Sequence, residues 1–275
     1  MLHQIGCILL KNINYKLLSN LLILLFVPTA AIADNPPQSQ KPSVNSSEAK
    51  KPKKPKKPKK RREPPSDYSR AGGSRGCPEE DIPLTVLAPT TFVGETTSLR
   101  PTLTWFASKP QPTEFRLFEL DQNTSTPKRI GVPIKLQSKS GINQLSLPQQ
   151  QPALTVGTAY IWQVSIDCQD SPLIQRAEFR VVHKPTVLDS QLVRVANSSQ
   201  KAYIYAEHDL WYEAMSEALK FAPQGKLEQV GSDIVQNLAQ SDSLIPEKLT
   251  SDQLEELNKE IQQRKNYLEK IGERY

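Results

Sequence analysis

The sequence is poor in the residues that carry most enzymatic and metal chemistry. Its 275 residues include only three histidines, three cysteines and two methionines. Histidine is the side chain whose ordinary pKa lies near neutral pH, so few groups here can move protons under those conditions. The chain contains no Gly-x-Ser-x-Gly nucleophile elbow, phosphate-binding glycine loop or two-histidine metalloprotease motif. We therefore expect no catalytic residues, no bound metal and no cofactor.

The remaining chemical candidates are isolated from one another. His183 and His208 would form a catalytic dyad only within hydrogen-bond reach of each other or of a nucleophile, and we expect both at the surface. Asp121, Asn123 and Ser125 have the alternate spacing of calcium ligands, but a threonine follows where such a loop needs glycine. A simple turn is therefore expected there.

Residues 1–33 have the three parts of a cleavable secretory signal. Lys11 and Lys16 lie in the leader, residues 21–27 form an apolar stretch, and Ala31-Ile32-Ala33 supplies small residues before the cut. A retained membrane anchor is the alternative, but serine, asparagine, proline and threonine interrupt the roughly 20 apolar residues that spanning needs. We expect an exported protein of the periplasm or cell envelope.

Export would leave two cysteines in the mature chain, because Cys7 lies inside the leader. An isolated pair in an oxidising compartment predicts a disulfide between Cys77 and Cys168. Zinc would need two more ligands at short spacing, and the histidines are remote.

Residues 34–76 are rich in proline, serine, glutamine and lysine and have almost no apolar residues, so we expect them to be disordered. A proline at every third position favours an extended polyproline II spacer. Residues 34–66 carry eleven basic and three acidic side chains, whereas residues 67–275 carry 22 and 26. The basic run comprises Lys51, Lys53, Lys54, Lys56, Lys57, Lys59, Lys60, Arg61 and Arg62.

Such a run would suggest nucleic acid in the cytosol, but export removes that partner and no aromatic residues interleave for base stacking. An anionic envelope surface is then the expected partner: lipid headgroups, lipopolysaccharide or an acidic glycan. A solvated linker without a partner is the plainer interpretation of the same residues.

Residues 77–185 show the period-two pattern of short strands separated by proline and glycine turns. About seven strands predict an antiparallel β-sandwich of the immunoglobulin or fibronectin kind within an α+β chain. Tyr160, Trp162 and Val164 share one strand face that Cys168 continues. We expect Trp105 and Trp162 in the core rather than on a surface platform for stacking sugars.

Residues 186–245 change to helical periodicity and predict a helical hairpin module, and residues 246–275 predict an amphipathic helix. Trp211 and Tyr212 cannot share one narrow helix stripe, so one of them is expected to line a groove for a protein partner. Arg264 interrupts the apolar stripe of the last helix. That helix is expected either to dock onto the body or to pair as a coiled coil.

Six short motifs follow one another in a set order over about residues 73–222. They are Gly73-Ser74-Arg75-Gly76-Cys77-Pro78, Leu84-Thr85-Val86-Leu87-Ala88-Pro89, Pro101-Thr102-Leu103-Thr104-Trp105, Ala159-Tyr160-Ile161-Trp162, Ala202-Tyr203-Ile204-Tyr205-Ala206 and Trp211-Tyr212-Glu213-Ala214. In this order they resemble a cyanobacterial family known as domain-of-unknown-function family 928. The resemblance implies an exported protein with a strand-rich half and a helical half, and it implies no activity.

These observations together predict an exported, non-catalytic binding or structural module of the cell envelope with a polybasic tether. An envelope enzyme acting on glycans, or an accessory to one, is the alternative hypothesis. Two carboxyl groups facing each other across a groove would favour it.

The disulfide predicts that the mature chain, unfolded without reductant, contains no free thiol. Thiol titration with an aromatic disulfide reagent measures this directly. Two titratable thiols would contradict the predicted Cys77–Cys168 bridge.

Overall fold

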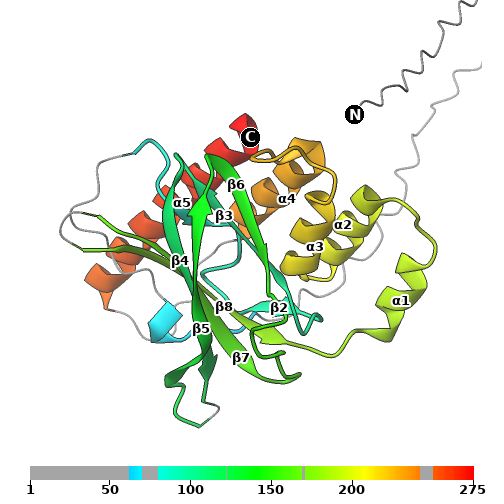
Figure 1. Cartoon of the computed structure of the whole chain (residues 1–275), viewed down its shortest axis with the longest axis horizontal. Coiled ribbons are helices and arrows are strands. Elements are labelled where there is room, and N and C mark those ends of the chain that lie inside the picture. The colour runs from blue at the N-terminus through cyan, green and yellow to red at the C-terminus, as the bar shows by residue number, and fades with distance from the viewer. Residues whose placement is uncertain (1–61, 70–79, 122, 169–170, 242–249) are drawn as a thin grey trace, which may run out of the picture. The chain divides into compact units, whose positions relative to one another are not determined.

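The computed structural model describes residues 62–69, 80–121, 123–168, 171–241 and 250–275, and these belong to one compact unit (Figure 1). The predicted leader and the basic run up to Arg61 lie outside the described residues. Two β-sheets and five α-helices form the described part, so the α+β class predicted from the sequence is confirmed.

The strands form one sheet of three and one of five. The three-stranded sheet is antiparallel and has the order β1 (Thr85–Val86), β3 (Thr102–Ala107), β6 (Gly141–Ser146). The larger sheet has the order β2 (Gly94–Thr96), β8 (Leu173–Val181), β7 (Ala159–Ile166), β4 (Gln111–Leu120), β5 (Pro127–Ser138).

The two sheets bury their inward side chains in one hydrophobic cluster. Trp105 from β3 and Trp162 from β7 are 1% and 0% exposed, as expected for core rather than for a sugar platform. Period two places Phe115 and Leu117 of β4 on the same inner face. The cluster also contains Leu103, Tyr160, Val164, Ala177, Phe179 and Val181.

One strand pairing differs from the predicted antiparallel sandwich. β2 runs parallel to β8, with Gly94 opposite Phe179 and Thr96 opposite Val181. The three residues of β2 are too few to show alternation, which is why the sequence pattern missed this strand. Gly94 is also where α3 (Trp211–Ala218) comes closest, since a Cβ there would lie 3.1 Å from Cε2 of Tyr212.

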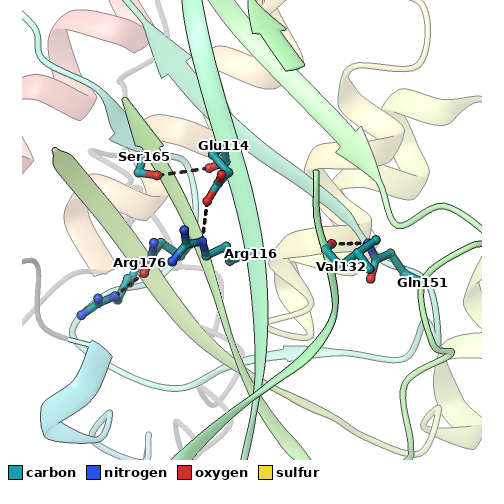
Figure 2. Close-up of polar contacts among 7 residues, drawn as sticks. Glu114, Arg116, Val132, Gln151, Ser165 and Arg176 are labelled. Atoms are coloured by element: carbon teal, nitrogen blue, oxygen red, sulfur yellow. Dashed lines mark hydrogen bonds and ion pairs between the residues drawn. The ribbon is translucent and has the colours of Figure 1, made fainter. Parts of the chain in front are cut away.

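The outer face of the five-stranded sheet is polar between β4, β7 and β8 (Figure 2). Arg116 pairs with Glu114 on β4, and the Nε of Arg176 donates to Oε1 of Gln163 at 2.9 Å. Beyond the sheet edge, Nε2 of Gln151 donates to the carbonyl of Val132 at 2.6 Å and joins β5 to the loop between β6 and β7. These polar side chains find partners on the sheet itself.

The helices are α1 (Thr186–Leu192), α2 (Ser198–Glu207), α3, α4 (Glu228–Ser241) and α5 (Ser251–Arg274). Asn197 caps α2 by accepting a hydrogen bond from the amide of Gln200 at 2.8 Å. Helices α3, α4 and α5 pack around a second hydrophobic cluster that includes Met215, Leu238 and Leu268.

Helix α5 docks onto the body through its C-terminal half. Leu268 and Ile271 are fully buried, and Lys270 and Arg274 both bond to Asp81, which lowers the pKa of that carboxyl. Arg264, the residue that interrupts the stripe, donates from Nη2 to the carbonyls of Val86 at 3.0 Å and Ala88 at 2.8 Å. The residue that interrupts the apolar stripe therefore bonds α5 to the carbonyls at the end of β1 and just after it.

This docking predicts unequal effects of two matched substitutions in α5. Leu268→Ala should lower the free energy of unfolding by about 2–5 kcal/mol, because it empties a buried site. Leu257→Ala, in the half-exposed part of the helix, should cost under about 1 kcal/mol. Urea unfolding of both variants measures the difference, and equal losses would contradict docking through the C-terminal half.

Candidate functional site

Trp211 and Tyr212 were the sequence-based candidates for a partner groove, and both are buried. They are 5% and 4% exposed. Tyr212 enters the cluster between the sheets, while Trp211 enters the cluster among the helices. The expectation that both could not be buried is wrong because α3 is covered on two sides, by sheet and by helices. Tyr212 nevertheless lines a cleft beside Thr96, and Trp211 lines one beside Arg62, so the partner groove stays a prediction.

Tyr212 also makes a buried polar contact in the sheet core. The Nε1 of Trp162 donates to its hydroxyl at 3.2 Å, and its ring lies 5.1 Å from that of Phe179 between centroids. Burial raises the pKa of the Tyr212 hydroxyl above its ordinary value. The hydroxyl gives the Trp162 N–H the partner that a buried donor needs.

Arg62, predicted to belong to the anion-binding tail, is bound to the body instead. Its guanidinium donates to the carbonyl of Ser241 at 2.9 Å and to Oδ1 of Asp209 at 3.0 Å. The same group lies 4.1 Å from the centroid of the Phe92 ring, a cation–π contact. Its charge is thus already engaged by helix ends and an aromatic face.

The residues after Arg62 continue along the sheet edge. Glu63 pairs with Arg180 at 2.5 and 3.0 Å, which raises the pKa of Arg180, and its carbonyl accepts from the amide of Val93 at 2.9 Å. This segment was predicted to be disordered together with the rest of 34–76. The prediction is wrong for residues 62–69. Their composition has few apolar residues, but hydrogen bonds and ion pairs hold them to the body.

Glu178 is the main polar attachment point for this segment. It is 5% exposed on β8, and its Oε2 accepts from the amide and the hydroxyl of Ser66 and from the hydroxyl of Ser69, at 2.8, 2.7 and 2.5 Å. A buried carboxylate needs such donors because an unpaired charge away from water is costly. We call residues 62–69 with these contacts the tail anchor.

A polar cleft of about 150 Å³ lies between α3 and the ends of β2 and β3. Oε1 of Glu213 accepts from Thr96, Thr97 and Ser98 at 2.6–3.2 Å. Oε2 of Glu213 and Oε2 of Glu217 are buried without a partner among the described residues. Both carboxylates come from one helix, four residues apart. They therefore share a wall and do not face each other as the glycosidase geometry requires.

The remaining candidates are separate in the structure. His208 bonds through Nε2 to Oε1 of Gln191 at 2.7 Å, and His183 is exposed at the end of β8. Asp121 accepts amide hydrogen bonds from Asn123 and Thr124 at 2.9 and 2.8 Å, which lower the pKa of Asp121. These are the bonds of a tight turn, as expected from the sequence.

Cys168 packs against the rim of the core between the sheets, and its sulfur is in a disulfide. Cys77, its predicted partner, lies outside the described residues, so the pairing stays a prediction. Lys51 to Arg61 of the basic run also lie outside the described residues, so their binding to an anion stays a prediction.

Two sheets with five helices define an α+β protein with no exposed aromatic site at α3. A model of the family described as Domain of Unknown Function (DUF928) matches residues 70–254. The chain therefore belongs to this family, as the sequence motifs indicated. No curated protein matches the chain in sequence.

Two solved structures resemble parts of the chain. The solution structure of CsgH from R. palustris is 7% identical and covers 35% of this chain and 91% of CsgH, with a TM-score of 0.23. A polysaccharide monooxygenase CBM33, studied by X-ray photoreduction, is 11% identical and covers 34% of this chain and 61% of its own, with a TM-score of 0.23. Within the described residues, no helix has the length and apolar character needed to cross a membrane.

The tail anchor predicts a local effect of removing Glu178. Glu178→Ala should speed hydrogen exchange of the Ser66 and Val93 amides by about fivefold or more, because three hydrogen bonds to one carboxylate oxygen are lost. Exchange in the interior of β7 should change little. Glu114→Ala, on the same sheet face but away from the anchor, is the matched control, and unchanged exchange at Ser66 in Glu178→Ala would contradict the anchor.

Proposed function

We propose that this chain is an exported, non-catalytic binding module of the cell envelope, held to an anionic surface by its polybasic segment. The observation that carries the proposal is the tail anchor. Arg62 and Glu63 bond to the helices and the sheet, so they fix the point at which the basic run leaves the body and keep that run close to it.

The charge distribution supports the same function. Eight basic residues precede Arg62, from Lys51 to Arg61, while residues 67–275 are mildly acidic. Each lysine or arginine near an anionic membrane surface contributes up to about 1 kcal/mol, and salt weakens this. The body itself is repelled by such a surface, so attachment depends on the tail.

Export is supported by the leader-like residues 1–33 and by the disulfide-bonded Cys168. The proposed location is therefore the periplasm or the envelope, where lipid headgroups, lipopolysaccharide and acidic glycans are the available anions. We also propose that the two sheets are a variant of the immunoglobulin-like sandwich in which β2 pairs in parallel with β8.

The tether can be tested by neutralising it without disturbing the anchor. A chain with all eight basic residues from Lys51 to Arg61 changed to glutamine, and Arg62 kept, should sediment far less with isolated envelopes at low salt than the unaltered chain. The unaltered chain should sediment at low salt and be released at about 0.5 M salt, where the Debye length is only a few ångströms.

The matched control keeps the charge and removes the prolines, with Pro52, Pro55 and Pro58 changed to serine. It should sediment like the unaltered chain, because the attraction depends on charge and not on the polyproline conformation. Salt-insensitive association of the unaltered chain would overturn the tether.

A further inference from the structure

A second cleft, of about 440 Å³, lies between the β5–β6 turn and the segment that joins α3 to α4. Its two walls are fixed to each other at the base. The amide of Ile142 donates to the carbonyl of Gly225 at 3.1 Å, and a Cβ on Gly141 would lie 2.3 Å from that oxygen. Gly141 and Gly225 both have positive φ, at 91° and 80°, so the chain needs glycine at this crossing. The cleft is preformed.

The charge of this cleft is opposite to that of the body around it. Its lining contains Lys139, Lys220 and Lys226 and no aspartate or glutamate. Lys139 donates to the neutral amide of Gln224 at 2.7 Å, and Lys226 lies 5.2 Å from the Tyr275 ring centroid. Neither of these two contacts is with a carboxylate. Lys220 is 3.9 Å from Glu217, a separation that leaves most of its charge available.

Neutral hydrogen-bonding groups accompany these ammonium groups. Gln137 and Gln144 line the cleft with exposed side chains, while Asn143 is used within the turn, where it accepts from the amide of Lys139 at 2.8 Å. Phe221, between the lining residues Lys220 and Ala222, is 81% exposed. Amides bind hydroxyl groups, an exposed ring can stack on a sugar face, and ammonium groups attract carboxylates.

We propose that this cleft binds an acidic glycan, a polysaccharide segment containing uronic acids. The proposal relies on the proposed export only for access to such a glycan, since the site uses no residue of the tail. Its volume lies within the range of about 300–1,000 Å³ usual for small-molecule sites.

Other anions fit the lining less well. A single phosphate is best held by converging donors such as the planar guanidinium of arginine, whereas these lysines lie on both walls of an open cleft and none of the lining residues is arginine. Single-stranded nucleic acid would need several aromatic platforms, and one exposed ring is present beside the lining.

The test uses the full chain in which Lys51 to Arg61 are neutralised with glutamine, so that the tail contributes no binding. Calorimetric titration with a galacturonic acid hexasaccharide should detect binding at about 0.05 M salt. The triple variant Lys139→Gln, Lys220→Gln, Lys226→Gln should bind about tenfold more weakly or worse, since each exposed charge contributes a few tenths to 1 kcal/mol. Phe221→Ala should weaken binding about threefold or more.

The matched control is Lys128→Gln, Lys201→Gln, Lys259→Gln, which removes the same charge at residues that do not line the cleft and should bind within about twofold of the parent. Urea midpoints of both triple variants verify that they fold. No binding to the tail-neutralised chain, equal weakening in both triple variants, or equal binding of a neutral galactose hexasaccharide or of inorganic phosphate would each overturn the proposal. Envelope sedimentation of the unaltered chain tests the tether separately.

Discussion

Three consecutive side chains in the first turn of α3 connect the two halves of the structure. Trp211 packs among the helices, Tyr212 packs between the sheets, and Glu213 accepts hydrogen bonds at the end of β2. Neighbouring side chains on a helix point about 100° apart. Three consecutive side chains can therefore all be buried only if other parts of the protein pack against the helix in all three directions. Helix α3 therefore contributes to both hydrophobic clusters and connects the strand-rich and helical segments, whose arrangement Figure 1 shows.

Most of the secondary structure could be predicted from periodicity because the buried faces are long enough to show it. The alternation through Tyr160, Trp162 and Val164 reflects burial on one side of β7, and Leu268 with Ile271 marks the docked face of α5. In contrast, β2 is too short to alternate, and its parallel pairing depends on β8, far along the chain. Local pattern carries no information about such a partner.

The functional residues were harder to predict for a related reason. Arg62 looks like the end of a uniform basic run, and only the fold brings Asp209, Ser241 and Phe92 around it. Of the three cleft lysines, Lys139 comes from the β5–β6 turn, whereas Lys220 and Lys226 come from the connection between α3 and α4, about eighty residues later, and no motif joins them. For Trp211 and Tyr212 the error was the opposite, because the sequence suggested an exposed aromatic ring where the structure buries both. Adjacent aromatic residues on a helix are exposed only when one side of that helix faces solvent.

The tail anchor has a mechanical consequence. A pull applied to the basic segment reaches Arg62 first, then the Glu63–Arg180 pair, and only afterwards the bonds of Ser66 and Ser69 to Glu178. Contacts that are loaded one after another break one at a time, at a lower force than contacts that are loaded together. Residues 62–69 would thus peel from the sheet edge before the strands themselves were strained, and could reattach once the tension ceased.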